Sequence, residues 1–186
     1  MIGYAMCGSF CTIDRAISQL YELVDKGYDV QPFMSENLYG SDTRFGKAED
    51  IIKEVESICG KKVVHTIIEA EPYGPSKPLE ALIICPCTGN TLAKMAHGIT
   101  DSAICMAAKA HMRNDRLTVI ALATNDALSA NLGNISTMLS RKNVYFVPLI
   151  QDDPIKKPHS LVADMDMLVP TLENAMKGKQ ICKLIK

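Results

Sequence analysis

The feature that most constrains the fold of this chain is a regular alternation between short apolar runs and amphipathic segments. Six runs have the length of buried strands, at residues 2–7, 29–34, 63–68, 82–85, 117–123 and 144–149. Strands that are joined by helices pair in parallel through right-handed crossovers. The alternation therefore predicts a doubly wound, three-layer α/β/α sandwich with about six parallel strands.

The segments between the runs carry apolar residues at helical spacing. In the first of them, Ile13, Ile17, Leu20 and Val24 form one stripe, and Thr12 precedes it as a candidate cap. Further helices are predicted over residues 48–58, from about residue 92, and over 102–112, 129–140 and 161–177. Because no repeat or long linker divides the chain, we predict a single domain over residues 1–186.

The bulk composition excludes several classes of function. Hydrophobic residues make up 47% of the 186 residues and charged residues 22%, as in ordinary globular proteins. The formal net charge of −1 provides no general attraction to nucleic acid or to anionic membranes. The apolar runs are too short to span a bilayer, and the first residues do not resemble a signal peptide. We therefore expect a cytoplasmic protein with neither nucleic-acid nor membrane partners.

The cysteines do not indicate a metal site. There are seven, at positions 7, 11, 59, 85, 87, 105 and 182. Their odd number and apolar surroundings favour free thiols. The C-x3-C spacing at 7–11 and the C-x-C spacing at 85–87 differ from the usual zinc pairs. We expect no metal and mostly buried structural thiols.

Polar loops follow four of the predicted strands. In a doubly wound sheet, ligands bind at the carboxyl ends of the strands. The loops at these ends are residues 8–12, 35–37, 87–91 and 124–126. Their glycines, hydroxyls and amides make this edge of the sheet the candidate binding site.

Two of these loops have the chemistry of a phosphate site, which uses backbone N–H groups at a helix start together with small hydroxyl side chains. The residues concerned are Gly8, Ser9, Thr12, Thr88, Gly89, Asn90 and Thr91. The same residue types are good helix caps, so capped turns without a ligand are the alternative. Neither G-x-G-x-x-G nor a Walker A motif is present. A mononucleotide such as FMN therefore suits the loops better than a dinucleotide or a nucleoside triphosphate.

A basic cluster follows the sixth predicted strand. Lys156, Lys157 and His159 lie in a segment bounded by prolines, at the ligand end of the sheet. They are candidates for binding a substrate carboxylate, with a solvated basic loop as the alternative. His65, inside the third predicted strand, and His97, within a helix, are expected to be structural.

The segment from residue 86 to 102 resembles a known motif. Its letters P-C-T-G-N-T-L-A-K, followed by H-G-I-T-D-S, resemble the P-A-S-A-N-T-x-A-K…G-x-x-D motif of the flavoprotein family of cysteine decarboxylases and flavin prenyltransferases. Residues 123–125 are similar to that family's P-A-M-N loop. The resemblance implies a Rossmann-like fold, FMN as cofactor, and a homo-oligomer that is a trimer or is built from trimers.

Within that family, the chain resembles the B chains of the dipicolinate synthases of spore-forming bacteria. This resemblance rests on motifs at 8–12, 43–46, 86–91, 101–110, 123–128 and 147–165. It implies an oxidoreductase subunit that helps to convert dihydrodipicolinate to dipicolinate in the mother cell during sporulation. The implied partner is an NAD(P)-binding A chain. One alternative, from a different class, is a scaffold subunit without its own catalysis that supports the A chain. The other is an FMN-dependent enzyme like the decarboxylases or flavin prenyltransferases, acting on another substrate.

Two departures argue against cysteine decarboxylation. The decarboxylases carry a histidine shortly before the strand that leads into the motif, whereas residues 69–75 contain none. They also carry a cysteine in a substrate clamp near the C-terminus, and residues 151–164 contain no cysteine.

The resemblance also implies roles for individual residues. Around the FMN phosphate it places Ser9, Thr12 and Ser35, and it makes Gly8 and Phe10 further cofactor-binding residues. Along the isoalloxazine and the rest of the cofactor it places Thr88, Gly89, Asn90, Thr91 and Thr124. The residues expected to meet the reacting substrate are Asn125, Lys157 and His159, with Lys156 beside them.

Overall fold

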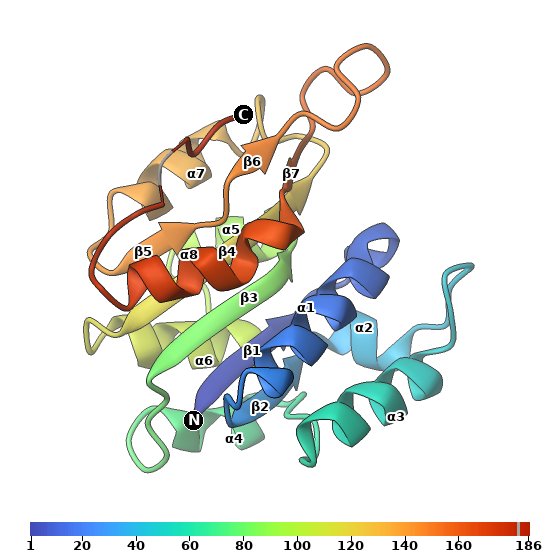
Figure 1. Cartoon of the computed structure of the whole chain (residues 1–186), viewed down its shortest axis with the longest axis vertical. Coiled ribbons are helices and arrows are strands. Elements are labelled where there is room, and N and C mark those ends of the chain that lie inside the picture. Colours follow the sequence, from blue (N-terminus) through green and yellow to red (C-terminus); the bar gives the residue numbers. More distant parts are fainter. Residues whose placement is uncertain (182) are drawn as a thin grey trace.

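The protein is described by a computed structural model that covers residues 1–181 and 183–186. Its centre is a seven-stranded sheet with the order β2-β1-β3-β4-β7-β6, and β5 pairs with β4 beside this path (Figure 1). The strands are β1 (Ile2–Met6), β2 (Val30–Met34), β3 (Ala81–Cys87), β4 (Leu117–Thr124), β5 (Val144–Phe146), β6 (Leu149–Ile150) and β7 (Leu161–Ala163). The strands from β1 to β5 run parallel, which confirms the predicted fold class.

Helices cover both faces of the sheet. They are α1 (Ile13–Asp25), α2 (Glu36–Gly40), α3 (Ala48–Cys59), α4 (Ile67–Ala70), α5 (Gly89–Ala96), α6 (Ala103–Met112), α7 (Leu132–Leu139) and α8 (Leu168–Ala175), with short 3-10 turns at Phe10–Thr12, Glu71–Tyr73 and Met165–Met167. Figure 1 shows α1 and α8 on one face and α5 and α6 on the other, and α1 also contacts α3. With both faces covered, every residue of β1, β2 and β3 is buried.

The predicted strand at 63–68 is wrong over most of its length. Val64 alone bridges to Phe33 of β2. At Thr66 the chain turns into α4 through a capping box, in which the hydroxyl of Thr66 accepts from the backbone of Glu69 and the carboxylate of Glu69 accepts in return. This local pairing overrides the apolar run, and it leaves Ile68 85% exposed.

The predicted strand at 144–149 is split at Pro148. Val144–Phe146 pair in parallel with β4, whereas Leu149–Ile150 pair antiparallel with β7. Proline has no N–H group to continue a ladder, so the chain changes partner at this point.

The last predicted helix, over 161–177, begins too early. Residues Leu161–Ala163 form β7, which lies antiparallel to β4 and β6, and α8 starts only at Leu168. The helix predicted over 129–140 similarly begins later, at Leu132. In the part of the chain that the structure describes, no helix is both long and apolar enough to cross a membrane.

Candidate functional site

A cavity of about 250 Å³ lies at the carboxyl ends of β1, β2 and β3, and we call it the strand-end cavity. Three of the polar loops predicted from the sequence meet there. Its lining residues are Cys7, Gly8, Ser35, Glu36, Asn37, Thr88, Asn90, Thr91, Lys94, Asp101 and Ser102. Five of the candidate cofactor residues are among them.

Thr88 forms one wall of this cavity and also begins α5. Its hydroxyl accepts from the backbone N–H of Thr91 at 3.3 Å and lies 3.1 Å from the hydroxyl of Thr91. The thiol of Cys7, at the end of β1, donates to that same Thr91 hydroxyl at 3.3 Å. Thr88 is therefore a helix cap and, at the same time, a hydroxyl in the cavity wall.

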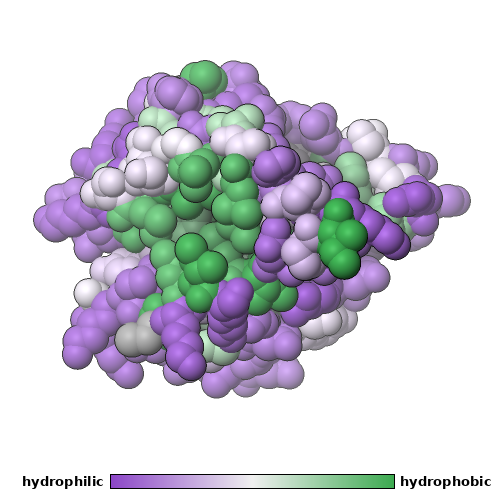
Figure 2. Space-filling view, turned by 90° about the horizontal axis from the view of Figure 1, so that it is seen from above, coloured by the Kyte–Doolittle hydropathy of each residue, from purple (hydrophilic) through white to green (hydrophobic). Residues whose placement is uncertain are grey.

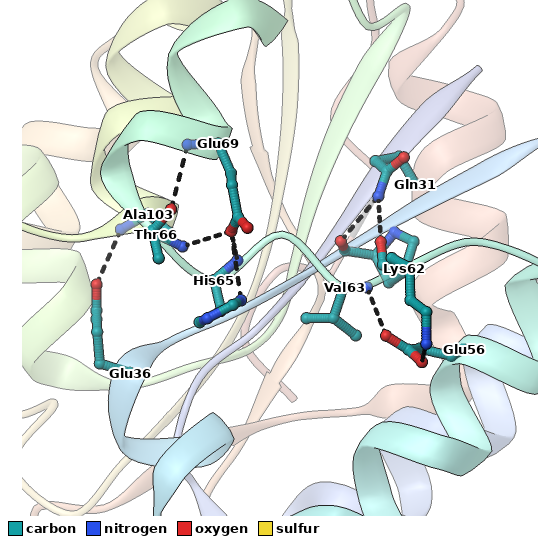
Figure 3. Close-up of polar contacts among 10 residues, drawn as sticks. Gln31, Glu36, Glu56, Lys62, Val63, His65, Thr66, Glu69 and Ala103 are labelled. Atoms are coloured by element: carbon teal, nitrogen blue, oxygen red, sulfur yellow. Dashed lines mark hydrogen bonds and ion pairs between the residues drawn. The ribbon is translucent and has the colours of Figure 1, made fainter.

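Two further helix starts border the cavity and are tied together. Ser35 caps α2 and Ser102 caps α6, each by accepting from a backbone N–H group of the first turn. The carboxylate of Glu36 accepts from the backbone N–H of Ala103 at 3.2 Å, a contact drawn in Figure 3. This bond joins the first turn of α2 to the first turn of α6 across the cavity edge.

Both acidic side chains in the cavity wall accept a hydrogen bond, but only Asp101 has a cationic partner. Glu36 is bonded to Ala103, and Asp101 accepts from the ammonium of Lys94 at 2.9 Å. The hydrogen bond from Lys94 lowers the pKa of Asp101, and the same bond raises the pKa of Lys94. In the first turns of α5 and α6, the N–H groups of Thr91, Ala103 and Cys105 are taken by side-chain acceptors. The remaining N–H groups of these turns have no partner inside their own helices and carry partial positive charge, which suits an anionic group.

Two buried thiols lie at the ends of β1 and β3, and one of them, Cys7, lines the cavity. Cys7 and Cys87 stand at the ends of β1 and β3, and the backbone N–H of Cys7 donates to Pro86 at 3.0 Å. A hydrogen bond with the Cys87 thiol lowers the pKa of Cys7, and the same contact raises the pKa of Cys87. The six described cysteines are all free thiols, and Cys182 lies outside the described residues.

Ser9, Phe10 and Thr12 lie beside the strand-end cavity and not in its wall. They belong to the turn between β1 and α1. The hydroxyl of Thr12 donates to the carbonyl of Ser9 at 2.8 Å, so it is engaged by its own loop. Their contact with a cofactor stays a prediction.

Gly89 lies where α5 approaches the end of β4. A Cβ atom at this position would come within 2.5 Å of both Thr124 Oγ1 and Asn131 Nδ2. Thr124 donates to the carboxylate of Asp126, which also accepts from Asn131 at 2.9 Å. These bonds lower the pKa of Asp126. Glycine at position 89 is therefore required by packing, and Thr124 is bonded within this cluster.

Lys157 and His159 lie in the loop between β6 and β7, which projects from the body in Figure 1, and Asn125 follows the end of β4. Asn125 Oδ1 accepts from the Ser160 hydroxyl at 3.4 Å, and the carbonyl of His159 accepts from the backbone of Leu128 at 3.0 Å. Lys157 forms an ion pair with Asp152 at 3.0 Å. None of the three lines the strand-end cavity, whose wall is made wholly of described residues.

Glu36 and Asn37 lie in the loop 35–37 that the sequence indicated, but they were not chosen as site residues. Cys7, Lys94, Asp101 and Ser102 also line the cavity and were not chosen either. Lys94 and Asp101 both belong to the motif at 86–102, so the motif itself could have indicated them as site residues. The link between Glu36 and Ala103 joins residues far apart in the sequence, so no local pattern indicates it.

A larger open groove, of about 720 Å³, lies between α2, α3 and α4. Polar side chains of this groove form hydrogen bonds that hold residues 62–66 beside β2. Figure 3 shows Glu56 bonded to Lys62 and Val63, and Glu69 bonded to His65 and Thr66. The ring of His65 is stacked on Tyr39 at 3.7 Å between centroids. We therefore place the candidate site at the strand-end cavity and assign the groove a structural role.

Comparison with known proteins assigns the chain to a family of the same fold. The model of the family described as Flavoprotein matches residues 1–173. The chain belongs to the flavoprotein family. This flavoprotein is 43% identical to the B subunit of dipicolinate synthase from Bacillus subtilis (strain 168), over 97% of this chain and 90% of that protein.

Solved structures give the same grouping. The crystal structure of the B subunit of dipicolinate synthase from Bacillus halodurans matches this flavoprotein with a TM-score of 0.91 and 39% identity, over 100% of this chain and 95% of that one. The FMN-dependent cysteine decarboxylase SpaF matches with a TM-score of 0.69 and 21% identity, over 94% and 95% of the two chains. At that identity the second match shows the shared fold alone.

Across residues 1–181 and 183–186, no group of three or more His, Cys, Asp or Glu side chains is arranged to hold a metal ion.

Proposed function

We propose that this chain is the B subunit of a dipicolinate synthase, which takes part in oxidising dihydrodipicolinate to dipicolinate in the cytoplasm of a sporulating mother cell. The observation that carries the proposal is the strand-end cavity with its hydroxyl, amide and helix-start donors. It occurs in a chain that is 43% identical to the B subunit of a dipicolinate synthase over almost its whole length.

The residues of the cavity fit the phosphate end of FMN. Hydroxyl groups of Ser35, Thr88 and Ser102 and the first turns of α5 and α6 supply donors. Both acids of the wall already have hydrogen-bond donors of their own, so they repel a phosphate less than free carboxylates would. These contacts support FMN as the cofactor of this chain.

The size of the cavity suggests how such a cofactor would lie. Its volume of about 250 Å³ is below the roughly 300–1,000 Å³ of pockets that enclose drug-sized ligands. The cavity therefore suits the phosphate and its chain, with the ring extending past Thr88, Asn90 and Thr91. A second copy of the chain is proposed to cover the ring, in a homo-oligomer such as a trimer.

An exposed apolar area supports association with other chains. Figure 2 views the end of the molecule that carries α7 and the β6–β7 loop, and it shows an apolar area surrounded by hydrophilic residues. Large apolar side chains are exposed on the elements of this end, including Leu132 at 52% and Ile185 at 69%. Contiguous apolar surface of this kind marks interaction sites.

Loss of a hydride and a proton converts the dihydropyridine ring into the aromatic pyridine. Bound FMN supplies a hydride acceptor, and NAD(P) on the A chain is the second one available to the complex. The proposed roles of this chain's residues are to bind and orient. Lys157 and His159 would meet a substrate carboxylate, and Asn125 would donate to the ring region through its amide. To do so, Lys157 exchanges its present partner, Asp152.

The test is reconstitution of the synthase from its two chains. Oxidation of dihydrodipicolinate is followed at fixed A chain and NAD(P)+, with and without this chain. We expect activity to depend on this chain and to fall at least tenfold for Lys157→Met, with Lys142→Met as the matched control. Full activity of the A chain alone would contradict the proposal. Activity that needs this chain but not Asn125, Lys157 or FMN would favour the scaffold role.

A further inference from the structure

A second pocket, of about 160 Å³, lies on the other side of the connection between α5 and α6, and we call it the α5–α6 pocket. Its walls come from the C-terminal end of α5, the connecting residues Gly98, Ile99 and Thr100, and one face of α6. It shares no lining residue with the strand-end cavity. The proposed flavin site therefore does not account for it.

The interior of the α5–α6 pocket is apolar. Met95, Ile99, Cys105 and Met112 form its walls. Met95 and Cys105 are almost fully buried, at 3% and 2% exposure, whereas Ile99 at the mouth is 47% exposed. Burial raises the pKa of the Cys105 thiol, so this group stays neutral and behaves as an apolar side chain. Methionine side chains adapt to the shape of a ligand because they are flexible and polarisable.

The rim of the pocket is cationic. Lys109, Arg113 and Arg141 are the charged residues of its lining, and none of the lining residues is acidic. Arg141 is held in place because its guanidinium donates to the carbonyl of Ala96, at the end of α5, at 3.2 Å. Within the described part of the chain, none of these three cations forms an ion pair with a carboxylate.

The pocket thus combines an apolar interior with three cations, on a chain of formal net charge −1. Other surface cations, such as Lys53, Lys94 and Lys142, each pair with a nearby carboxylate, so their charge is partly neutralised. Three uncompensated cations around an apolar hollow provide both parts of a recognition site for an amphipathic anion. A simple inorganic anion is a poorer fit than an amphipathic one, because the apolar walls contribute nothing to its binding.

The volume limits the ligand further. About 160 Å³ is the room of roughly five liquid waters at about 30 Å³ each, well below pockets for drug-sized molecules. One ring or a short branched chain fills it. We propose that the α5–α6 pocket binds a small carboxylate whose body is a single ring or its aliphatic equivalent, with the carboxylate at the Lys109–Arg141 rim. This proposal does not rest on the proposed flavin site.

The pocket is also placed to affect the strand-end cavity. Residues Gly98, Ile99 and Thr100 line the first, and Asp101 and Ser102, which follow directly, line the second. A ligand bound in the α5–α6 pocket would hold residues 98–100 in place, and these residues directly precede Asp101, which pairs with Lys94 in the cavity wall.

The test uses isothermal titration calorimetry on the full chain with benzoate as the probe. Benzylamine, which has the same ring and the opposite charge, is the second probe. We expect saturable binding of one benzoate per chain at this pocket and no saturable binding of benzylamine. Absence of benzoate binding, or equal binding of the two probes, would overturn the proposal.

Two pairs of variants locate the site. Ile99→Glu puts a negative charge at the mouth and is expected to abolish saturable benzoate binding at the pocket, whereas Ile68→Glu, at another exposed isoleucine, leaves the Kd unchanged. Lys109→Gln is expected to raise the Kd by about two- to fivefold, the size of an exposed ion pair, whereas Lys142→Gln leaves it unchanged. Benzoate binding that survives Ile99→Glu unchanged would place the ligand elsewhere and refute this assignment.

Discussion

The carboxylate of Glu36, in the first turn of α2, accepts a hydrogen bond from the backbone N–H of Ala103, in the first turn of α6, at 3.2 Å. The two residues are 67 positions apart in the sequence. Their bond fixes the distance between two helices that border the strand-end cavity. It also engages a carboxylate that would otherwise face an anionic ligand without compensation.

Replacing Glu36 tests this link. Glu36→Ala leaves the N–H of Ala103 without its partner, so we expect the free energy of unfolding to fall by about 1–2 kcal/mol. Urea denaturation of the variant measures the change. Glu54→Ala is the matched control, because Glu54 is exposed on α3, and it is expected to stay within about 0.5 kcal/mol of the wild type. Equal stability of Glu36→Ala and the wild type would show that the bond contributes nothing.

Gly89 is predicted to tolerate substitution poorly because its surroundings are tightly packed. Its substitution by alanine brings a methyl group within 2.5 Å of Thr124 Oγ1 and Asn131 Nδ2, so we expect a loss of about 1–3 kcal/mol in unfolding free energy. Gly133 lies in α7 and has open space around it. Gly133→Ala should therefore stabilise the protein slightly, since alanine is the better helix former. Thermal or urea denaturation compares the pair, and a harmless Gly89→Ala would contradict the contact.

His111 is predicted to make stability depend on pH. Burial lowers its pKa to about 4, and its Nε2 lies 2.6 Å from the carbonyl of Leu117. The unfolded chain binds a proton at this residue below its ordinary value of 6.5, whereas the folded chain does so only near 4. The stabilisation is therefore complete above pH 6.5 and is lost as pH falls toward 4, by about 1.4 kcal/mol per unit.

Urea denaturation at pH 7 and pH 5 measures this effect. From pH 7 to pH 5 the His111 contribution should lower the unfolding free energy of the wild type by about 2 kcal/mol, and His111→Gln should lack that part of the decrease. His97→Gln, at an exposed histidine, should keep it. An identical pH dependence in wild type and His111→Gln would remove His111 as the cause.

The fold class was predictable because it depends on patterns that repeat within short windows. The apolar runs of β1, β3 and β4 are buried on both faces, and the stripe of α1 has helical spacing. The errors occurred where a different interaction decided the structure. Thr66 and Glu69 close a capping box inside an apolar run, and Leu161–Ala163 become a strand only because β4 and β6 lie on either side of them.

The candidate site was predictable in outline for a related reason. Parallel strands bring their carboxyl ends to one edge, so Gly8, Ser35 and Thr88 meet although they are distant in the sequence. The direction of single side chains was not predictable. The hydroxyl of Thr12 turns to the carbonyl of Ser9, and Thr124 donates to Asp126, because hydroxyls readily bond to groups in their own loop.

Titration of the purified protein with FMN, followed by flavin absorbance and fluorescence, shows directly whether the strand-end cavity holds a flavin. We predict saturable binding of about one FMN per chain, weakened at least tenfold in Asn90→Asp, because a carboxylate in the cavity wall can only accept where the amide can donate. Asn114→Asp, on the exposed side of the molecule, is the control and should bind as the wild type does. No FMN binding by the wild type, or equal binding by Asn90→Asp, would contradict the assignment of the strand-end cavity as a flavin site.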